Sequence, residues 1–135
     1  MSKLDDLHRF IVELNYVAAE KINSIQDEVA VIATCRPATV NTIVIAEKHY
    51  KGVLTIDDFP HQSISEDELF AQISTWLCDV DTHRREIAKI ILRLGEVSND
   101  RADLEIEIDF EDFIEAIEDP TGSITFNNKT YRRLT

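Results

Sequence analysis

The sequence predicts an α+β fold, in which helices pack on one face of an antiparallel or mixed β-sheet and a hairpin ends the chain. Apolar residues recur every three or four positions near the N-terminus and again from Ser65 to Leu77, which is the spacing of amphipathic helices. From Ala102 to Phe110 they alternate with acidic residues, which is the pattern of a strand with one buried face. Because 135 residues suit one core, we expect residues 1–135 to form a single domain.

The first predicted element is a helix from about Leu4 to Lys21 that packs on the sheet. Ser2 is suited to cap it, and Asp5 and Asp6 are favourable near the positive N-terminal end of a helix. Its apolar stripe consists of Leu4, Leu7, Phe10, Ile11, Leu14, Val17 and Ala18.

The next segments are predicted to be extended, with two points left open. Residues 22–36 form either a buried strand or a helix end, because periodicity cannot separate these in so short an apolar run. Residues 39–46 and 53–56 are rich in Val, Ile and Thr, which favours strands. Between them, the polar residues before Gly52 form either a tight hairpin turn or part of one strand with a bulge at this glycine. We favour the hairpin.

The segment after Pro60 predicts the main core helix. Ser65 and Glu68 have the spacing of a capping box, and Pro60 ends the preceding strand because it cannot donate to a sheet ladder. We expect Trp76 to be buried against the strands together with the rest of the apolar face. That face consists of Leu69, Phe70, Ile73, Trp76 and Leu77.

The second half of the chain begins with an ambiguous stretch and then turns to strands. Helical spacing over residues 83–97 predicts a second helix that ends at Gly95, although a continuation of the previous helix or a partly strand-like connector would also fit. The alternation of residues 102–110 slips at 111–113, which indicates a β-bulge or a short helix. The tail predicts a hairpin in which Ile124 and Phe126 lie opposite Tyr131, with the turn at Asn127–Asn128.

The composition limits the possible functions. A net charge of −12 argues against binding to nucleic acid along an open surface and against a basic membrane-surface role. No apolar run is long enough to span a bilayer, so we expect no membrane partner. The two distant cysteines, Cys35 and Cys78, are expected to be buried small apolar residues and not a redox pair.

The sequence contains no strong catalytic or metal-binding motif. Asp79, Asp81 and His83 alternate and could share a side, but a helix end is also a favoured place for Asp, so we predict no metal site there. The histidines form no helical pair, and the chain contains neither a phosphate-binding loop nor a nucleophile elbow. We therefore expect no catalytic residue and no cofactor.

The strand from Ala102 to Phe110 carries four carboxylates on one face: Asp103, Glu105, Glu107 and Asp109. A solvated sheet face is the simple explanation. Like charges in a row nevertheless cost stability unless they are solvated or paired with basic residues. Repulsion of DNA in a channel, or pairing with basic side chains of a neighbouring subunit, would give the row a function.

Several stretches together resemble the tail completion protein R family of temperate contractile-tailed phages. They are Tyr50 with Val53–Ile56 and Asp58–Phe59, the capped helix that ends in Trp76–Leu77, the alternating strand ADLEIEIDF and the C-terminal FIEAIEDPTGSITFNNKTY. The resemblance covers roughly Thr39 to Tyr131.

The resemblance implies a non-enzymatic virion protein with a fold like that of tail terminators. Such a protein would form a homo-oligomeric ring, expected to be a hexamer, that completes the tail at its head-proximal end. Its partners would be other copies of itself, tail tube and sheath proteins, and head–tail connector proteins. DNA would meet it only by passage through the lumen. It would be located in the neck region of the virion tail after assembly in the bacterial cytoplasm.

For such a ring, we expect the carboxylate row to face either the lumen or basic residues of a neighbour. The basic candidates are Arg84, Arg85, Arg132 and Arg133. Two other classes of function compete with this one: an acidic inhibitor that mimics DNA, and a metal-dependent enzyme built on Asp79, Asp81 and His83.

Overall fold

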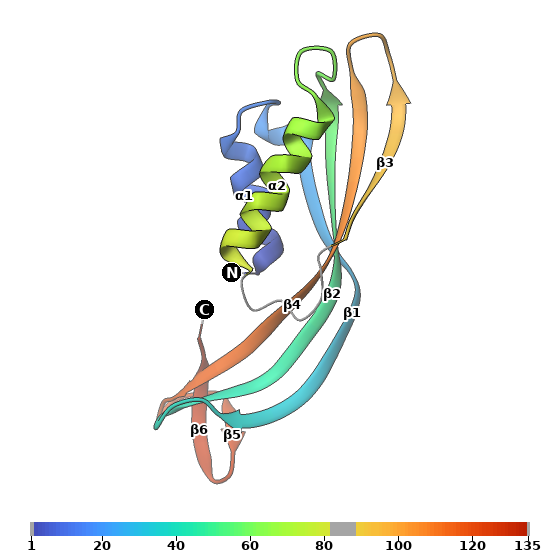
Figure 1. Cartoon of the computed structure of the whole chain (residues 1–135). Helices are drawn as coiled ribbons and strands as arrows, with labels where there is room; N and C mark the ends of the chain where they lie inside the picture. The colour runs from blue at the N-terminus through green and yellow to red at the C-terminus, as the bar shows by residue number, and fades with distance from the viewer. Residues whose placement is uncertain (1, 82–88, 135) are drawn as a thin grey trace.

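The structure, a computed structural model, describes residues 2–81 and 89–134. Within them, six strands form one antiparallel sheet in the order β1-β2-β4-β6-β5, and β3 pairs with another part of β4 (Figure 1). The elements are α1 (Lys3–Glu13), the 3₁₀ turn η1 (Ala19–Lys21), β1 (Ile22–Pro37), β2 (Thr42–Phe59), α2 (Glu66–Val80), β3 (Ile90–Val97), β4 (Ala102–Glu118), β5 (Ile124–Phe126) and β6 (Lys129–Arg133). The predicted α+β class with an antiparallel sheet is confirmed.

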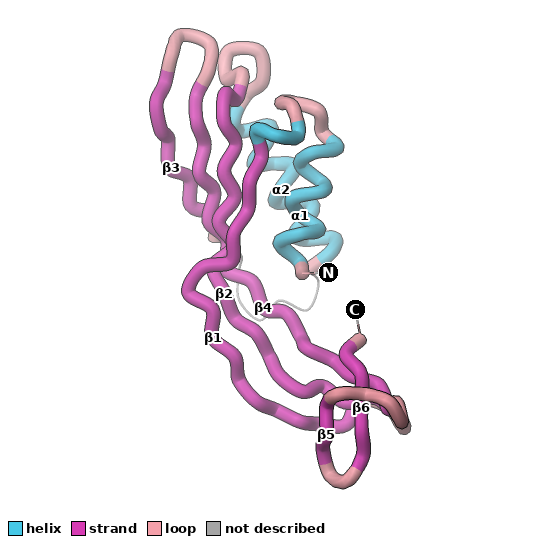
Figure 2. The backbone as a smooth tube through the Cα atoms, turned by 180° about the vertical axis from the view of Figure 1, so that it is seen from behind, coloured by secondary structure: helices cyan, strands magenta, loops and turns pink. Residues whose placement is uncertain are grey.

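Strands β1, β2 and β4 run the whole length of the molecule, which has an upper half with the helices and a lower half with the β5–β6 hairpin (Figure 1). The upper half is covered by α1 and α2 on one face only, as predicted (Figure 1). The lower half carries neither of the two described helices and curls toward the helix side, where the β5–β6 hairpin closes its end (Figure 2). The sheet is therefore a curled half-barrel, and no described helix or strand covers its face opposite the helices.

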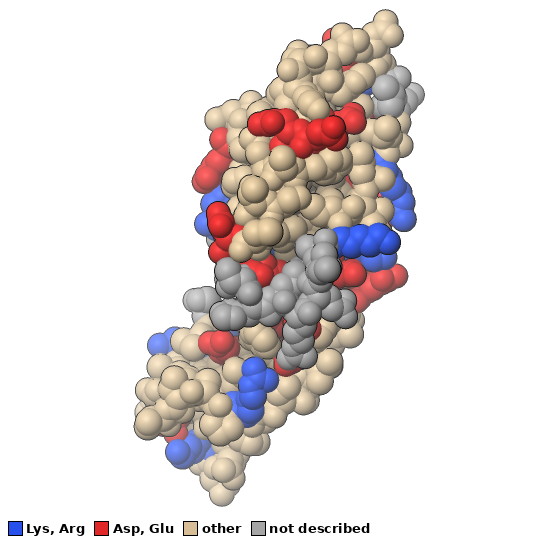
Figure 3. All heavy atoms as spheres, in the orientation of Figure 1, with Lys and Arg blue, Asp and Glu red and all other residues tan. Residues whose placement is uncertain are grey.

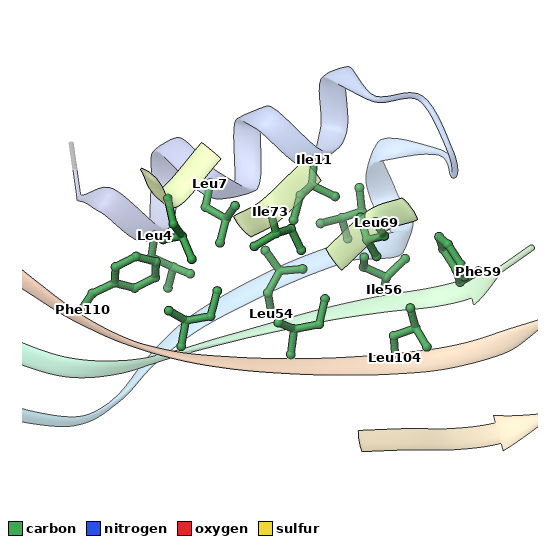
Figure 4. Close-up of a cluster of buried hydrophobic side chains, with 14 of the residues drawn as sticks. Leu4, Leu7, Ile11, Leu54, Ile56, Phe59, Leu69, Ile73, Leu104 and Phe110 are labelled. Carbon is green, nitrogen blue, oxygen red and sulfur yellow. The ribbon is translucent and has the colours of Figure 1, made fainter. Parts of the chain in front are cut away.

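Each half has its own apolar core. The upper core lies between the two helices and the sheet, and Leu69, Ile73 and Phe59 are completely buried there (Figure 4). Burial of such side chains contributes about 1.5–3 kcal/mol each, so the helices are held mainly by this layer. The lower core is a small cluster of Ile43, Ala116 and Tyr131 under the hairpin.

Helix α1 begins as predicted but is shorter than predicted. Ser2 and Asp5 form a capping box, in which the Ser2 hydroxyl accepts from the Asp5 N–H at 3.1 Å. The helix ends at Glu13, because Asn15 adopts a left-handed conformation with φ of 58°. The predicted helix to Lys21 is thus wrong beyond the third turn, although the buried stripe is confirmed for Leu4, Leu7 and Ile11.

The favoured hairpin at Gly52 is wrong, because β2 is one strand of 18 residues. Gly52 lies in the middle of β2, where a side chain would meet the core: a Cβ atom would lie 2.9 Å from the Phe110 ring and 3.1 Å from Leu4. The glycine therefore allows close packing and makes neither a turn nor a bulge. The bulges lie elsewhere, between Val44 and Ala46 and between Ile56 and Phe59. Residues 22–36, left open above, lie within strand β1.

Helix α2 is confirmed, but the burial of its tryptophan is not. The Ser65 hydroxyl caps the helix by accepting from the Asp67 N–H at 3.1 Å. The predicted capping box with Glu68 is wrong, because the Glu68 N–H donates to the Ser65 carbonyl and not to its hydroxyl. Leu69, Ile73 and Leu77 form the buried face. The ring of Trp76 is only half-buried: it packs against the edge of the upper core and stacks on the Phe10 ring of α1, with the two ring centroids 6.1 Å apart.

The predicted second helix is wrong over residues 90–97, which form strand β3; residues 82–88 lie outside the described part of the chain. Its spacing also fits a strand, since Ile90, Leu92 and Leu94 lie opposite the buried Ile108, Ile106 and Leu104 of β4. Gly95 consequently lies within a strand and ends no helix.

The last strands are confirmed with one extension. Strand β4 continues to Glu118, so the slip at residues 111–113 reflects neither a short helix nor a bulge in β4 itself. The extra residue belongs to β2, whose bulge at Ile45 lies opposite the step from Ile114 to Glu115. In the hairpin, Ile124 pairs with Tyr131 as predicted, but Phe126 pairs with Lys129 and not with Tyr131. Asn127 and Asn128 form the predicted turn, with positive φ values of 53° and 64°.

Candidate functional site: the charged face of the sheet

The side of the sheet opposite the helices carries a dense set of ionisable side chains, here called the charged face. Strand register produces it, because Glu105, Glu107 and Asp109 lie opposite Thr55, Val53 and Lys51 while the alternate β4 residues point into the core. Its members are Asp103, Glu105, Glu107, Asp109 and Glu111 of β4, Glu47, His49 and Lys51 of β2, Arg93 of β3, and Glu28 and Arg36 of β1. Figure 3 shows the helix side instead, where acidic side chains gather over the upper half and blue Lys and Arg side chains lie along its margins and on the lower half.

In the upper half, basic residues on both neighbouring strands bind the carboxylates. Arg93 Nη1 donates to Glu105 Oε2 at 3.1 Å and also contacts Glu107 Oε1. Lys51 Nζ lies 4.0 Å from the other Glu107 oxygen and 3.2 Å from Glu28, and the hydrogen bond to Glu28 raises the pKa of Lys51. Because Glu107 is only 7% exposed, these contacts compensate a carboxylate removed from water. The row of like charges is thus stabilised within the chain.

Further down, a histidine joins two strands through both ring nitrogens. His49 Nε2 lies 3.3 Å from Glu47 Oε2, and Nδ1 lies 3.2 Å from Glu111 Oε1. The other oxygen of Glu47 is 3.4 Å from Arg36 Nη1, whose guanidinium also lies 5.5 Å above the Phe113 ring. The imidazole therefore bridges a carboxylate of its own strand and a carboxylate of β4.

Glu47, His49 and Glu111 also have one potential ligand atom each within 4.8 Å of one another, so they could approach a metal ion. The geometry favours ion pairing, however. A histidine binds a metal through one nitrogen, and the two carboxylates here lie against different nitrogens of the ring. Arg36 further occupies an oxygen of Glu47.

Arg132 and Arg133, which are predicted to meet the carboxylate row from a neighbouring subunit, lie away from this row within the described chain. Arg132 and Arg133 lie opposite Ile117 and Ala116 at the lower end of β4, and Arg132 pairs with Asp119 at 3.4 Å. Arg84 and Arg85 lie outside the described residues. Contacts of these arginines with a neighbouring subunit stay a prediction.

A family model of the P2 phage tail completion protein R (GpR) matches residues 1–134. The chain belongs to this family. The resemblance found in the sequence is therefore confirmed, and it extends over the N-terminal helix as well. Searches of curated proteins and of solved structures each give no significant match.

Family membership makes the chain a structural component of the phage tail, with a role in tail completion and with other tail components as partners, and not an enzyme. The absence of a metal site at Asp79, Asp81 and His83 stays a prediction. Asp81 is buried and pairs with Lys3 Nζ at 2.7 Å, which joins the end of α2 to the start of α1. His83 lies outside the described residues. No helix in the described ranges is long and apolar enough to span a membrane.

Sequence reasoning found the carboxylates of β4 but missed their partners Arg93, Lys51 and His49. These contacts depend on how β2 and β3 align with β4, whereas the sequence pattern places Arg93 in a helix and Lys51 and His49 in a turn. The alternation Leu92, Arg93, Leu94 was a signal for the strand. The two cysteines also differ from expectation: Cys35 is half-buried and Cys78 is exposed.

Proposed function

We propose that this tail completion protein forms a closed homo-oligomeric ring, a hexamer, that caps the tail tube at its head-proximal end and docks to the head connector. Membership of the tail completion protein R family supports this role. The ring would contact tube and sheath proteins on one side and connector proteins on the other. Virions would carry it in the neck, after assembly in the host cytoplasm.

The observation that carries the finer proposal is the charged face. It runs along β4 on the side that no described helix covers, and its exposed members include Asp109 and, in part, Glu105. If this face borders the lumen, carboxylates would repel the phosphate backbone of passing DNA, whereas a basic wall would hold it. If it instead borders a neighbour, Arg132 and Arg133 at the other end of the molecule are the candidate partners.

The carboxylates are not interchangeable in a test of this proposal. Glu107 is buried against Arg93 and Lys51, so its replacement by lysine would disturb the fold. Glu105 and Asp109 are better sites, because they reach solvent and Arg93 keeps Glu107 as a partner. The test variant is therefore Glu105→Lys with Asp109→Lys.

The assay is the titre of infectious particles when each variant replaces the wild-type protein during phage production. We expect the double lysine variant to fold, as judged by circular dichroism, and to give few infectious particles. The matched control is Glu13→Lys with Glu20→Lys, which makes the same change in charge at exposed positions on the helix side. A normal titre from the charged-face variant, or an equal loss from the control, would contradict the placement of this face.

A further inference from the structure

Strand β1 is an edge strand of unusual length and composition. It pairs only with β2 and has no strand partner on its other side within the described ranges. It is 16 residues long, whereas most strands contain about five or six. Along it, four β-branched apolar side chains are strongly exposed, namely Ile25 at 61%, Val29 at 48%, Val31 at 59% and Ile32 at 51%.

The usual protection of an edge strand is weak here. Natural edges are kept from pairing by charges, proline, bulges or short length. β1 has bulges after Asp27 and after Ala33, but Ala30–Ala33 between them is a regular ladder, and the stretch Val29–Thr34 contains no charge, glycine or proline. An open strand of this kind promotes association unless something covers it. A covering partner therefore explains how such an edge persists.

The opposite edge of the upper half offers a complementary surface. Strand β3 is the outer strand there, and it exposes Ile91 at 38% and Leu94 at 55%. Since β1, β2, β4 and β3 are successively antiparallel, β1 and β3 run in opposite directions. Copies set side by side in the same orientation would thus present β1 of one to β3 of the next as antiparallel neighbours.

The alignment of residues across the four strands also favours contact between β1 and β3 of neighbouring copies. Ile25, Val53, Glu107 and Ile91 form one row across the sheet, on the charged face. Continuing that row into a second copy brings Ile25 against Ile91 of the next copy. Two residues further along the antiparallel pair, the exposed Asp27 would lie opposite the exposed Lys89, so apolar and charged side chains both find suitable partners.

We propose that the Ile22–Asp27 part of β1 in one copy adds to β3 of the next, so that the upper halves of neighbouring sheets join edge to edge around the ring. In this register Val29–Thr34 extends past Ile90, where β3 begins. The contact is heterologous, one patch meeting a different patch, which is what a closed cyclic assembly requires. It also places the charged faces of successive copies in one continuous surface. The inference rests on the ring proposed above and specifies its interface.

The test uses disulfide cross-linking of the full chain in a background with Cys35→Ser and Cys78→Ser. Facing residues of antiparallel strands have Cα atoms about 4.5–5.5 Å apart, which lies within the range of about 4.4–6.8 Å that a disulfide accepts. Single variants Ile25→Cys and Ile91→Cys are oxidised separately and as a mixture, and the double variant is oxidised alone. We expect a cross-linked dimer only in the mixture, and a ladder of oligomers from the double variant.

Three results would overturn the edge contact. Dimers of Ile25→Cys alone would show a two-fold β1–β1 pairing instead. Oligomers in sedimentation without any Ile25–Ile91 cross-link would show that copies associate through another surface, and the ring itself would stand. A wild-type chain that sediments as a monomer at every concentration would refute self-association through this edge, while the infectivity assay would still decide the role in tail completion.

A charge substitution provides an independent readout. Ile25→Lys should abolish the oligomer seen in sedimentation while leaving the circular dichroism spectrum unchanged, because the side chain is already exposed. The matched control is Val40→Lys, at a fully exposed valine in the turn between β1 and β2, which should leave the oligomer intact. An oligomer that survives Ile25→Lys would refute the proposal.

Discussion

Gly52 offers a sharp test of how the upper core is built, because replacement by alanine adds a single carbon at a known place. The added Cβ would lie 2.9 Å from Phe110 Cδ2 and 3.1 Å from Leu4 Cδ1. Carbon atoms pack favourably at about 3.5–4.0 Å, so the ring would have to retreat by more than half an ångström. Phe110 is 2% exposed and its ring centroid lies 5.8 Å from that of Tyr50, which leaves it little room to move.

Two terms set the size of the effect. Overpacking of a close-packed core typically costs about 1–3 kcal/mol. Against this, alanine restricts the unfolded chain and stabilises the fold by about 0.4–1 kcal/mol, provided that the backbone conformation suits it. The φ angle of Gly52 is not positive, so this term applies. We therefore expect Gly52→Ala to lower the free energy of unfolding by about 0.5–2 kcal/mol.

Urea unfolding measures this difference, and the double variant Gly52→Ala with Phe110→Leu is its control. A leucine at position 110 removes the ring that the new methyl group meets, so the alanine should cost little or nothing in that background. A Gly52→Ala protein at least as stable as wild type would refute the packing argument. It would show that the Phe110 ring yields to the added methyl group at no cost in free energy.

Three further predictions follow from other parts of the molecule. Ile73→Ala should lower the free energy of unfolding in urea by about 2–5 kcal/mol, whereas Trp76→Ala should cost less because its ring is only half-buried; the opposite order would place Trp76 in the core. Calorimetric titration with zinc, manganese and magnesium should show no stoichiometric site that depends on Asp81, whose carboxylate is held by Lys3. Hydrogen bonds from the backbone N–H and the hydroxyl of Thr121 lower the pKa of Asp119. The contribution of Asp119 to stability should therefore be present above the ordinary carboxyl pKa and be lost as the pH falls through the lowered pKa. An NMR titration of Asp119 with an ordinary midpoint would contradict that contact.

Local sequence patterns decide some elements of this fold and leave others open. Strand β4 was predictable because Leu104, Ile106 and Ile108 alternate strictly with acidic residues, and both helix caps were predictable from Ser2 and Ser65. The signals failed where local patterns allow two structures. The residues before Gly52 resemble a turn, but they belong to a long strand in which Tyr50 points into the core while His49 and Lys51 form ion pairs on the charged face.

In the candidate site, the acidic residues were predictable from the sequence but their basic partners were not. The acidic row lies in one strand and is visible in the sequence as an alternation. Its basic partners Arg93 and Lys51 come from strands on either side, so their contacts depend on non-local register that no local period encodes. The same limit applies to the exposed edge of β1, since exposure of Ile25 follows from the sheet order and not from the residues around it.

Electron microscopy of lysates from a phage that lacks only this protein tests the central claim most directly. The account predicts filled heads separate from tails that are not completed at their head-proximal end, and it predicts that the wild-type chain supplied in trans restores joined, infectious particles. Joined particles of normal appearance and infectivity in the absence of the protein would contradict a role in completing the tail.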